Sequence, residues 1–223
     1  MKAMILAAGL GKRMRPLTDH CPKPLLPVAG KPLIVHHLER LAASGIEEVI
    51  INVSYRADQI IEALGDGRQW GLKIAFSREE APLETAGGIS HARPLLGDSP
   101  FVLINGDIWC DLDLSTLPAL GDNLAHLVLV DNPPQHATGD FHLDSENRVQ
   151  DSGGPRLTYA GIALLDPRLV DGLPEPCYPL APLLRQAMAE GRVSGQHHHG
   201  QWVDVGTPER LRELDLQLST TRS

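Results

Sequence analysis

The sequence predicts an α/β fold in three layers, with helices on both faces of a mixed central sheet. Short apolar runs alternate with helical patterns along most of the chain, and turn residues follow the apolar runs. Runs that are apolar throughout are typical of strands covered on both faces. After Asp111 the alternation loosens, which favours added strands that run in other directions within the same sheet.

Four strands and three helices are predicted in the first half of the chain. The first strand is Met4-Ile5-Leu6, and the first helix covers residues 32–44 with its apolar residues on one face. Pro32 suits the first turn of that helix, and Gly45 suits its carboxyl-terminal cap. The remaining strands are predicted at 49–53, 72–76 and 101–104, and the remaining helices at 57–64 and 86–95.

The second half is predicted to combine further strands with two helices. A strand covers 127–130, a hairpin pairs 141–143 with 148–150, a longer strand covers 157–165, and helices cover 178–190 and 207–218. No internal repeat occurs, so no carboxyl-terminal β-helix is expected. The length of 223 residues, of which 42% are hydrophobic, predicts one domain over 1–223.

The composition argues against several classes of protein. A net charge of -8 disfavours a nucleic-acid partner, because phosphate backbones require a basic face. Three cysteines without a C-x-x-C pair predict neither a disulfide framework nor a zinc site. The apolar run from Ala3 to Ala7 is too short for a signal peptide, and no stretch reaches the roughly 18–20 residues that span a bilayer. We therefore expect a cytoplasmic protein without a membrane partner.

A glycine-containing loop follows the first strand directly. Gly9 and Gly11 allow a ligand to approach the backbone closely, and exposed N–H groups in such loops bind phosphate. The loop is not a dinucleotide fingerprint, because Met14 occupies the position of the last glycine, and it is not a P-loop, because Arg13 replaces Ser or Thr. A cation-rich phosphate loop and an ordinary turn both fit this pattern.

The next segment carries a lysine between two prolines. Residues 21–32 read Cys-Pro-Lys-Pro-Leu-Leu-Pro-Val-Ala-Gly-Lys-Pro, and four prolines fix the backbone around Lys23. We expect Lys23 to be presented from a rigid, extended loop and not from a helix. Together, the two segments favour a site for a phosphorylated ligand over an ordinary solvated lysine.

These two segments resemble those of the sugar-phosphate nucleotidyltransferase family, whose members share L-A-A/G-G-x-G-T-R-L-x-P-L-T and then P-K-P-L-L-P-V-x-G-K-P. Lys12 replaces the usual Thr, and Met14 replaces the usual Leu. The resemblance covers essentially the whole chain. It implies a Rossmann-like fold, Mg²⁺ as the cofactor, and a nucleoside triphosphate and a sugar 1-phosphate as substrates. It also implies a nucleotide-binding half at 1–113 and a half at 114–223 that binds the sugar and completes the metal site.

The resemblance assigns roles to residues of the first half. It implies that Arg13, Lys23 and Asp107 are catalytic, with Arg13 and Lys23 stabilising charge at the α-phosphate. The nucleotide-binding residues that it implies are Ala8, Gly9, Gly11, Lys12, Arg13, Lys23, Glu79, Thr85 and Gly87.

Two aspartates stand beside glycine turns at the ends of apolar runs. Asp107 ends Asn105-Gly106-Asp107, and Asp204 lies in a W-x-D-x-G-T-P turn. Two carboxylates suit Mg²⁺, which also takes phosphate oxygens and water, although each aspartate alone also fits a plain turn. The family resemblance implies that the two turns jointly bind the catalytic Mg²⁺. Asp111 and Asp113 are rival acids, but their position indicates the start of a helix.

The base and sugar contacts are implied by weaker likenesses. The loop over 82–88 matches P-L-G-T-A-G, which contacts the nucleobase and sugar in the family, with Glu84 in place of a glycine. Glu79 falls where uridylyl- and thymidylyltransferases of the family often carry glutamine. Its carboxylate can accept one hydrogen bond from uracil N3–H, but it can accept two from guanine, from N1–H and the N2 amino group. This difference slightly favours guanine as the base. The sugar-binding residues implied are Glu84, Asn105, Gly139, Asp140, Tyr159 and Gly161.

The lysine that family members carry after the hairpin, to hold the sugar phosphate, is missing. Either Arg156 replaces it, or the loop is shortened and opened for an unusual sugar. The short chain, this opened loop and the overall match resemble the members of the family that use UTP and N-acetylmuramate α-1-phosphate in cell-wall sugar recycling, and this resemblance implies the same substrates here. GTP with mannose 1-phosphate is the alternative within the family, and a non-catalytic nucleotide-sugar sensor is the alternative of another class. The oligomeric state stays open.

Three consecutive histidines, His197 to His199, form the remaining unusual segment. Because successive residues of a strand point to opposite faces, at most His197 and His199 share one face. An exposed polar run is favoured here over a metal site, and the segment is internal and too short for an affinity tag.

Overall fold

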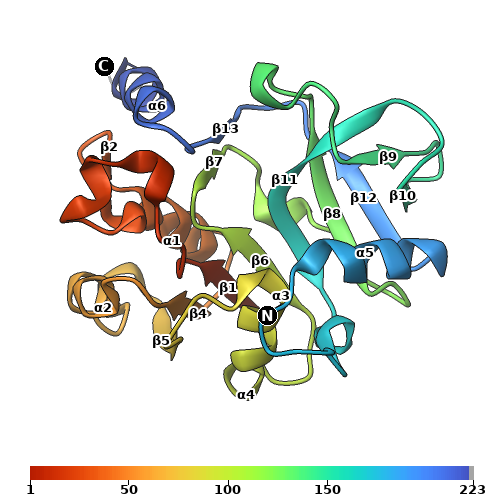
Figure 1. The fold of residues 1–223 in the computed structure, drawn as a ribbon, viewed down its shortest axis with the longest axis horizontal. Coiled ribbons are helices and arrows are strands. Elements are labelled where there is room, and N and C mark those ends of the chain that lie inside the picture. Colours follow the sequence, from red (N-terminus) through yellow and green to blue (C-terminus); the bar gives the residue numbers. More distant parts are fainter. Residues whose placement is uncertain (221–223) are drawn as a thin grey trace.

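The computed structural model describes residues 1–220 as a nine-stranded mixed sheet with helices on both faces (Figure 1). Seven strands follow one another in the order β10-β9-β11-β6-β1-β4-β5, while β8 pairs with β11 and β12 pairs with β8. The strands of this sheet are β1 Lys2–Leu6, β4 Glu48–Val53, β5 Lys73–Arg78, β6 Phe101–Asn105, β8 Ala125–Val130, β9 Phe141–Leu143, β10 Val149–Gln150, β11 Arg156–Leu165 and β12 Val193–His197. The predicted α/β class is confirmed.

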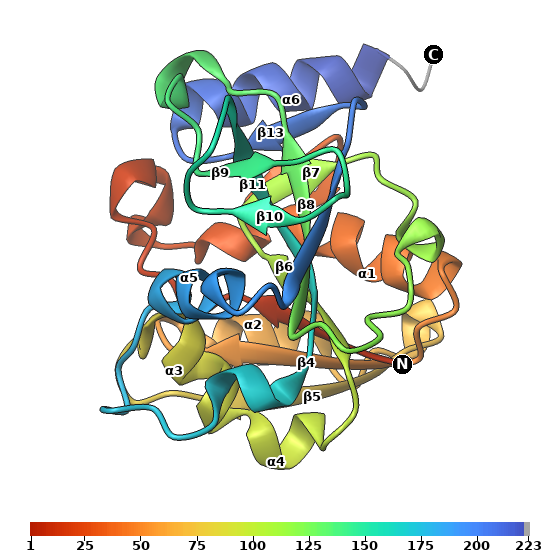
Figure 2. The same cartoon turned by 90° about the vertical axis from the view of Figure 1, so that its right-hand side faces the viewer.

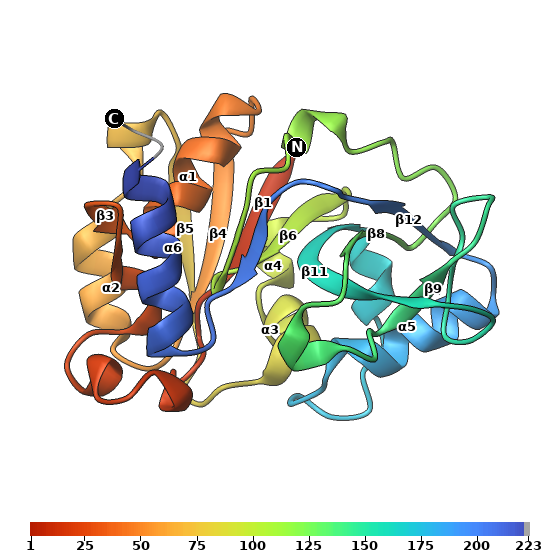
Figure 3. The ribbon, with the colours of Figure 1, turned by 90° about the horizontal axis from the view of Figure 1, so that it is seen from above.

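Helices cover both faces of the sheet, because successive residues of its strands point to opposite faces and are apolar on each. Ala3 and Ile5 of β1 pack in a core with α1 and α2, whereas Met4 packs in a second core with α3, α4 and α5. Figure 3 shows these two groups of helices on opposite sides of the strands. The helices are α1 Leu33–Ala43, α2 Ala57–Leu64, α3 Glu84–His91, α4 Arg93–Leu96, α5 Leu180–Ala189 and α6 Pro208–Thr220. None of these helices is both long and apolar enough to cross a membrane within the described residues.

The register of the parallel strands determines where the loops emerge. Leu6, at the end of β1, lies opposite Asn52 of β4 and opposite Asn105 of β6. The loops after these strands therefore leave the sheet at one edge, which is where ligands bind in open α/β sheets. The antiparallel pairing of β11 with β6 joins the second half of the chain to this edge.

Two short ribbons bring distant segments of the chain together. β7 Ile108–Cys110 pairs with β13 Trp202–Asp204, and β2 Pro27–Val28 pairs with β3 Lys31–Pro32. Helix α6 packs on β2, and a third apolar core between them includes Met14, Val205 and Leu214. In Figure 2, α6 and β13 lie together at the end of the molecule opposite α4.

Two expectations about local structure are corrected. Lys23 lies in a single 3-10 turn, Lys23–Leu25, and not in an extended loop. Pro24 is compatible with this turn, because the backbone N–H groups in the first turn of a helix have no hydrogen-bond partner within the helix. The helix expected at 86–95 is two helices, α3 and α4, separated where Pro94 cannot donate a backbone hydrogen bond. The strands β2, β3, β7, β12 and β13 were not predicted.

Candidate active site

A cavity of about 300 Å³ opens at the sheet edge where β1, β4 and β6 end. We call it the first cavity. Its walls come from the glycine loop, the turn around Lys23, the loop after β5 and the end of β6. The lining residues are Leu6, Ala7, Ala8, Gly9, Lys23, Pro24, Asn52, Glu79, Pro82, Leu83, Glu84, Thr85, Asn105, Gly106 and Asp107.

The glycine loop forms one wall of the first cavity. Ala8 and Gly9 line it, and Gly11 has a left-handed backbone with φ of 61°. The Thr18 hydroxyl donates to the Gly11 carbonyl at 2.8 Å, and this contact fixes the turn. Lys12 and Arg13 are exposed in the following 3-10 turn and lie outside the lining residues. The structure therefore places the glycines at the cavity and the two cations at its periphery.

A buried hydrogen-bond network connects the glycine loop to the loop after β5. Asn52 Oδ1 accepts from the Ala7 N–H at 2.7 Å, and its Nδ2 donates to Glu79 Oε1 at 2.8 Å. The other oxygen of Glu79 accepts from the Leu83 N–H at 3.2 Å. Glu79 is only 4% exposed, so both of its carboxylate oxygens already have protein donors. Sequence reasoning missed Asn52, although a polar residue inside a buried apolar strand could have indicated it.

The start of α3 forms the opposite wall. Thr85 lines the first cavity, and Glu84 does so with a left-handed backbone, φ of 61°. A glycine adopts that conformation at no steric cost, which explains why a glycine is usual at this place in the family motif. Gly87 lies inside α3, where an added Cβ would be 2.1 Å from the Pro176 carbonyl oxygen. The structure therefore gives Gly87 a close-packing position and not a cavity wall.

Lys23 and Asp107 line the first cavity and form an ion pair beside the second cavity. The Lys23 ammonium donates to Asp107 Oδ2 at 2.8 Å, and Lys23 is 9% exposed. The two residues are 84 positions apart in the chain, so the fold brings the predicted phosphate-binding cation to a predicted metal ligand. A lysine with so little access to water interacts more strongly with anions than an exposed lysine does.

The β7–β13 ribbon brings Asp204 to the same place. Asp204 lies opposite Ile108, and the Val205 N–H donates to the Asp107 carbonyl at 2.8 Å. Each aspartate uses its Oδ2 in an ion pair, Asp107 with Lys23 and Asp204 with Arg210 of α6. Two carboxylates from rigid strand ends, beside open cavity space, are a donor set that fits a hard divalent cation such as Mg²⁺.

A second cavity of about 290 Å³ lies on the other side of Asp107. Asn105 and Asp107 line both cavities, so these two residues lie at the junction between them. The lining residues of the second cavity are Asn105, Asp107, Ile108, Pro133, Gln135, His136, Asp140, Thr158, Tyr159, Gly161, Trp202 and Asp204. Four of the predicted sugar-binding residues, Asn105, Asp140, Tyr159 and Gly161, therefore share this cavity.

Asp140 braces the wall of the second cavity. Its Oδ1 lies 2.9 Å from His136 Nε2, and its Oδ2 accepts from the Tyr159 N–H at 2.8 Å. Gly139, also predicted to bind the sugar, is packed behind the wall, because an added Cβ would be 2.6 Å from Asn132 Oδ1. Arg156 donates to the carbonyls of Asp140 and Asp151 and lies outside the cavity lining.

Gln135, His136 and Trp202 line the second cavity but were not predicted. Trp202 Nε1 donates to the Ala160 carbonyl at 2.8 Å, which holds the β13 strand against β11. The tryptophan belongs to the same turn as Asp204 and could have been included with it. Gln135 and His136 lie in the 3-10 turn Pro134–His136, whose sequence has no repeating pattern, so nothing in the sequence indicated them.

The geometry is that of a nucleotide-sugar enzyme: a glycine loop, a buried lysine, and two carboxylates between two cavities. The nucleotidyl transferase family matches residues 2–151. The chain belongs to this family, which confirms the resemblance found in the sequence.

Individual relatives make the likeness more specific. The chain is 52% identical over 222 residues to N-acetylmuramate alpha-1-phosphate uridylyltransferase from Neisseria meningitidis serogroup B, with 96% of each chain covered. It is 37% identical to the protein of the same name from Caulobacter vibrioides, with 97% and 96% covered. A mannose-1-phosphate guanyltransferase from Schizosaccharomyces pombe is 31% identical, and the match covers 66% of that protein.

Solved structures share the fold. HddC from Yersinia pseudotuberculosis superposes with a TM-score of 0.80 and 26% identity, covering 97% of this chain and 99% of that one. A chain from Bacillus anthracis superposes with a TM-score of 0.85 at 21% identity, covering 98% and 95%. The mixed sheet with flanking helices is thus the fold of the solved relatives.

Proposed function

We propose that the chain transfers a uridylyl group from UTP to N-acetylmuramate α-1-phosphate, giving UDP-N-acetylmuramate and pyrophosphate. The observation that carries this proposal is the Lys23–Asp107 pair, which lies where a cavity beside the glycine loop adjoins a second cavity. An enzyme that joins two phosphorylated substrates needs their reacting phosphates at such a junction. The choice of substrates follows from the relatives that are 52% and 37% identical.

In this proposal the chain supplies position and charge. An oxygen of the sugar phosphate attacks the α-phosphorus, the bond from that phosphorus to the bridging oxygen breaks, and pyrophosphate leaves with the electron pair. The attacking oxygen is already anionic, so no general base is required. Lys23 stabilises charge at the α-phosphate, the backbone of Ala8 and Gly9 holds the triphosphate, and Arg13 reaches it from the periphery.

Asp107 and Asp204 would hold a divalent cation, and we propose Mg²⁺. When bound, Mg²⁺ neutralises phosphate charge and orients the phosphate oxygens. Arg210 holds Asp204 in place from α6 through the ion pair with its Oδ2. Each aspartate has a second oxygen, Oδ1, that faces no hydrogen-bond donor among the described residues, which supports this assignment.

The environment of Glu79 supports uridine over guanine. A carboxylate recognises guanine with both of its oxygens, but both oxygens of Glu79 accept from Asn52 and Leu83. In this proposal Glu79 shapes the base pocket through Asn52 and does not contact guanine. Mannose-1-phosphate guanylyltransferase activity, the alternative, would require Glu79 to give up these donors.

In this proposal the two halves of the chain bind different substrates. Residues 1–113 supply the nucleotide site, and 114–223 supply Asp204 and most of the second cavity. UTP is an intracellular metabolite, which fits a cytoplasmic site of action. The reaction class places the protein after the enzyme that makes the sugar 1-phosphate and before one that uses the nucleotide sugar.

Release of pyrophosphate, measured for four nucleoside triphosphates with several sugar 1-phosphates, tests the proposal. We expect UTP with N-acetylmuramate α-1-phosphate to give the highest kcat/KM. Asp107→Ala should lower turnover roughly a thousandfold, whereas Asp113→Ala, in an exposed cap, should leave it unchanged. Preference for GTP and mannose 1-phosphate would overturn the choice of substrates. Nucleotide binding without turnover of any pair would favour the sensor.

A further inference from the structure

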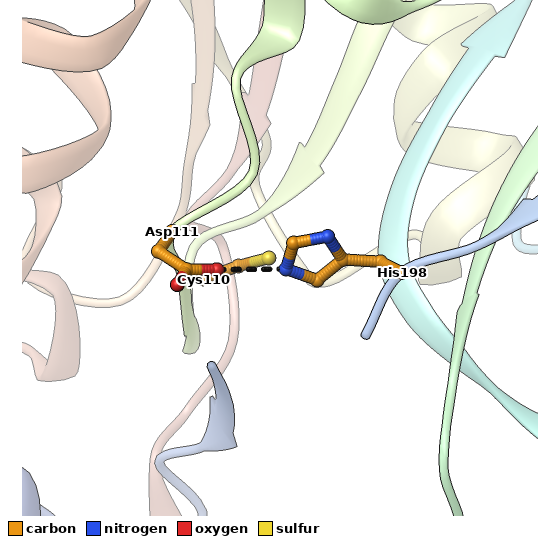
Figure 4. Close-up of side chains that lie close together, drawn as sticks. All are labelled: Cys110, Asp111 and His198. Carbon is orange, nitrogen blue, oxygen red and sulfur yellow. Dashed lines mark hydrogen bonds and ion pairs between the residues drawn. The ribbon is translucent and has the colours of Figure 1, made fainter. Parts of the chain in front are cut away.

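The three consecutive histidines project to two faces of the sheet, and each face has its own partners. His197 Nε2 lies 2.9 Å from Asp131 Oδ1, and the ring centroids of His197 and His199 are 3.9 Å apart. His198 points the other way, where its Nε2 lies 2.7 Å from Asp111 Oδ1, close to Cys110 (Figure 4). The proposed nucleotidyl transfer uses none of these residues.

The pairing of strands fixes the first of these groups. β12 runs parallel to β8, with His197 opposite Leu129, and the His198 N–H donates to the Leu129 carbonyl at 2.8 Å. Asp131 is the first residue after β8, and His199 is the second residue after β12. Alternation in strands places Asp131, His197 and His199 on one face. The three ligand atoms all lie within 4.8 Å of one another, and His197 is the last residue of β12.

We propose that Asp131, His197 and His199 form a second metal site, distinct from Asp107 and Asp204, that binds Zn²⁺ or a similar transition ion. Two imidazoles and one carboxylate are the ligand set of open zinc sites, in which water takes the fourth position. Tetrahedral zinc bonds of about 2.0–2.2 Å separate two ligand atoms by about 3.3–3.6 Å. The 2.9 Å between His197 Nε2 and Asp131 Oδ1 needs only a small adjustment.

The opposite face is a poorer site, although it also presents three ligand atoms. Cys110 is fully buried, and burial raises the pKa of its thiol, so the thiolate that a metal needs is disfavoured. The guanidinium of Arg40 also interacts with Cys110, and its positive charge opposes a bound cation. Asp131 and His199 are exposed, and an ion therefore reaches them directly from solvent.

An ion at this site would act on the second cavity. Asp131 follows β8 directly and begins the segment that carries Pro133, Gln135 and His136 into the lining of that cavity. A bond from the ion to Asp131 would tie the start of this segment to the end of β12. We therefore expect Zn²⁺ to slow amide hydrogen exchange over 131–140.

Cobalt titration of the 223-residue chain, first freed of transition metals, tests the site. Excess Mg²⁺ is kept present, because Asp107 and Asp204 offer only hard oxygen ligands and stay occupied by Mg²⁺. We expect one equivalent of Co²⁺ to bind with visible absorption bands of nitrogen and oxygen coordination, and Zn²⁺ to displace it. His199→Gln and Asp131→Asn should each weaken binding by about tenfold or more.

His198→Gln is the matched control, because it alters the neighbouring histidine on the opposite face. It should leave the affinity for Co²⁺ and the absorption bands unchanged. The circular dichroism and melting temperature of each variant, measured without Co²⁺, establish that it is folded. Absence of a cobalt spectrum would overturn the proposal. So would a thiolate-to-cobalt band that His198→Gln abolishes, or full binding in His199→Gln, because each places the ion elsewhere.

Discussion

Gly161 lies where β11 changes its register with β8, and two separate constraints act on it. Its backbone is left-handed, with φ of 75°, and an added Cβ would lie 2.8 Å from Asn105 Nδ2. Asn105 lines both cavities, so a side chain at position 161 would push directly on the junction between them. One added methyl group at position 161 would therefore press on Asn105, at the junction of the two cavities.

Gly161→Ala should lower kcat/KM by about tenfold or more, because misplacement of a positioning residue by about 1 Å is costly. The left-handed backbone alone should cost about 1 kcal/mol of unfolding free energy. Gly121→Ala is the control, since Gly121 has φ of 57° but an added Cβ there meets nothing within 4 Å. Urea unfolding should show a loss of this size for Gly121→Ala and a larger loss for Gly161→Ala, because its Cβ also contacts Asn105. Equal activity of the two would contradict a role for the Asn105 contact.

His136 is the only histidine, lysine or arginine that lines the second cavity, as far as the described residues show. Asp140 orients it through the 2.9 Å contact to Nε2. N-acetylmuramate carries a lactyl carboxylate that N-acetylglucosamine lacks, and a charged hydrogen bond contributes about 1.5–3 kcal/mol. His136→Gln should thus lower kcat/KM about tenfold for N-acetylmuramate 1-phosphate.

The comparison substrate is N-acetylglucosamine 1-phosphate, for which His136→Gln should change kcat/KM less than about twofold. Steady-state pyrophosphate release with both sugars gives the two ratios. An equal loss with both substrates would show that His136 supports the wall of the cavity and does not recognise the carboxylate.

At the scale of elements, α6 contributes to the proposed Mg²⁺ site although none of its residues lines either cavity. Arg210 projects from its first turn and pairs with Asp204 Oδ2, which holds the carboxylate at the end of β13. Groups that orient a metal ligand typically change metal affinity 10- to 100-fold when they are removed. The packing of α6 on β2 therefore connects the carboxyl-terminal helix to the proposed Mg²⁺ site.

Arg210→Gln should raise the Mg²⁺ concentration for half-maximal rate by about tenfold or more, with kcat at saturating Mg²⁺ close to that of the wild type. Arg212→Gln is the control on the same helix, because Arg212 forms an exposed pair with Glu209 that contributes little. Rates measured over a series of Mg²⁺ concentrations give both values. A loss of kcat without a change in the Mg²⁺ requirement would remove Arg210 from this role.

The elements that the sequence predicted are those with a strong local signal. The buried strands of the first half are apolar runs, and the parallel sheet follows from them. β12, with the sequence Val-Ser-Gly-Gln-His, has no such run and is a strand because β8 pairs with it. β7 and β13 have three residues each and form through pairing across about 90 positions of chain. Local propensity carries no information on such contacts.

In the candidate site too, local motifs indicated single residues, whereas their contacts depend on long-range pairing. Lys23 and Asp107 were predicted from motifs, but their ion pair depends on the long-range register of the sheet. Glu79 was assigned to the base from its place in the sequence. The structure adds that Asn52 and Leu83 already donate to both of its oxygens. Partners of a side chain are thus the part of a site that motifs leave out.

At the scale of the whole molecule, stability depends on burying a histidine in the neutral state. His37 of α1 is 2% exposed, and its Nε2 has no hydrogen-bond partner among the described residues. Burial lowers the pKa of His37 from 6.5 to about 3. Burial also lowers the pKa of His126 in β8. Unfolding exposes both imidazoles to water, where they bind protons more readily.

Stability should therefore fall as the pH falls below 6.5, because the unfolded chain takes up protons that the folded chain does not. For His37 alone, the loss between pH 7 and pH 5 is about 2 kcal/mol. The lowered carboxyl pKa values, such as that of Asp166, lie below this window and act only at more acidic pH. Urea unfolding at both pH values measures the loss.

His37→Leu should remove most of this pH dependence, because leucine fills the buried position without a titratable group. At pH 7 the variant should be about as stable as the wild type or more so, since a buried nitrogen without a partner is replaced. His142→Leu, at a half-buried hairpin position, is the control and should keep the full dependence. A slope between pH 7 and pH 5 that is equal in His37→Leu and the wild type would show that His37 is not the group responsible. An equal slope would mean that the folded protein opens near α1 and lets His37 bind a proton.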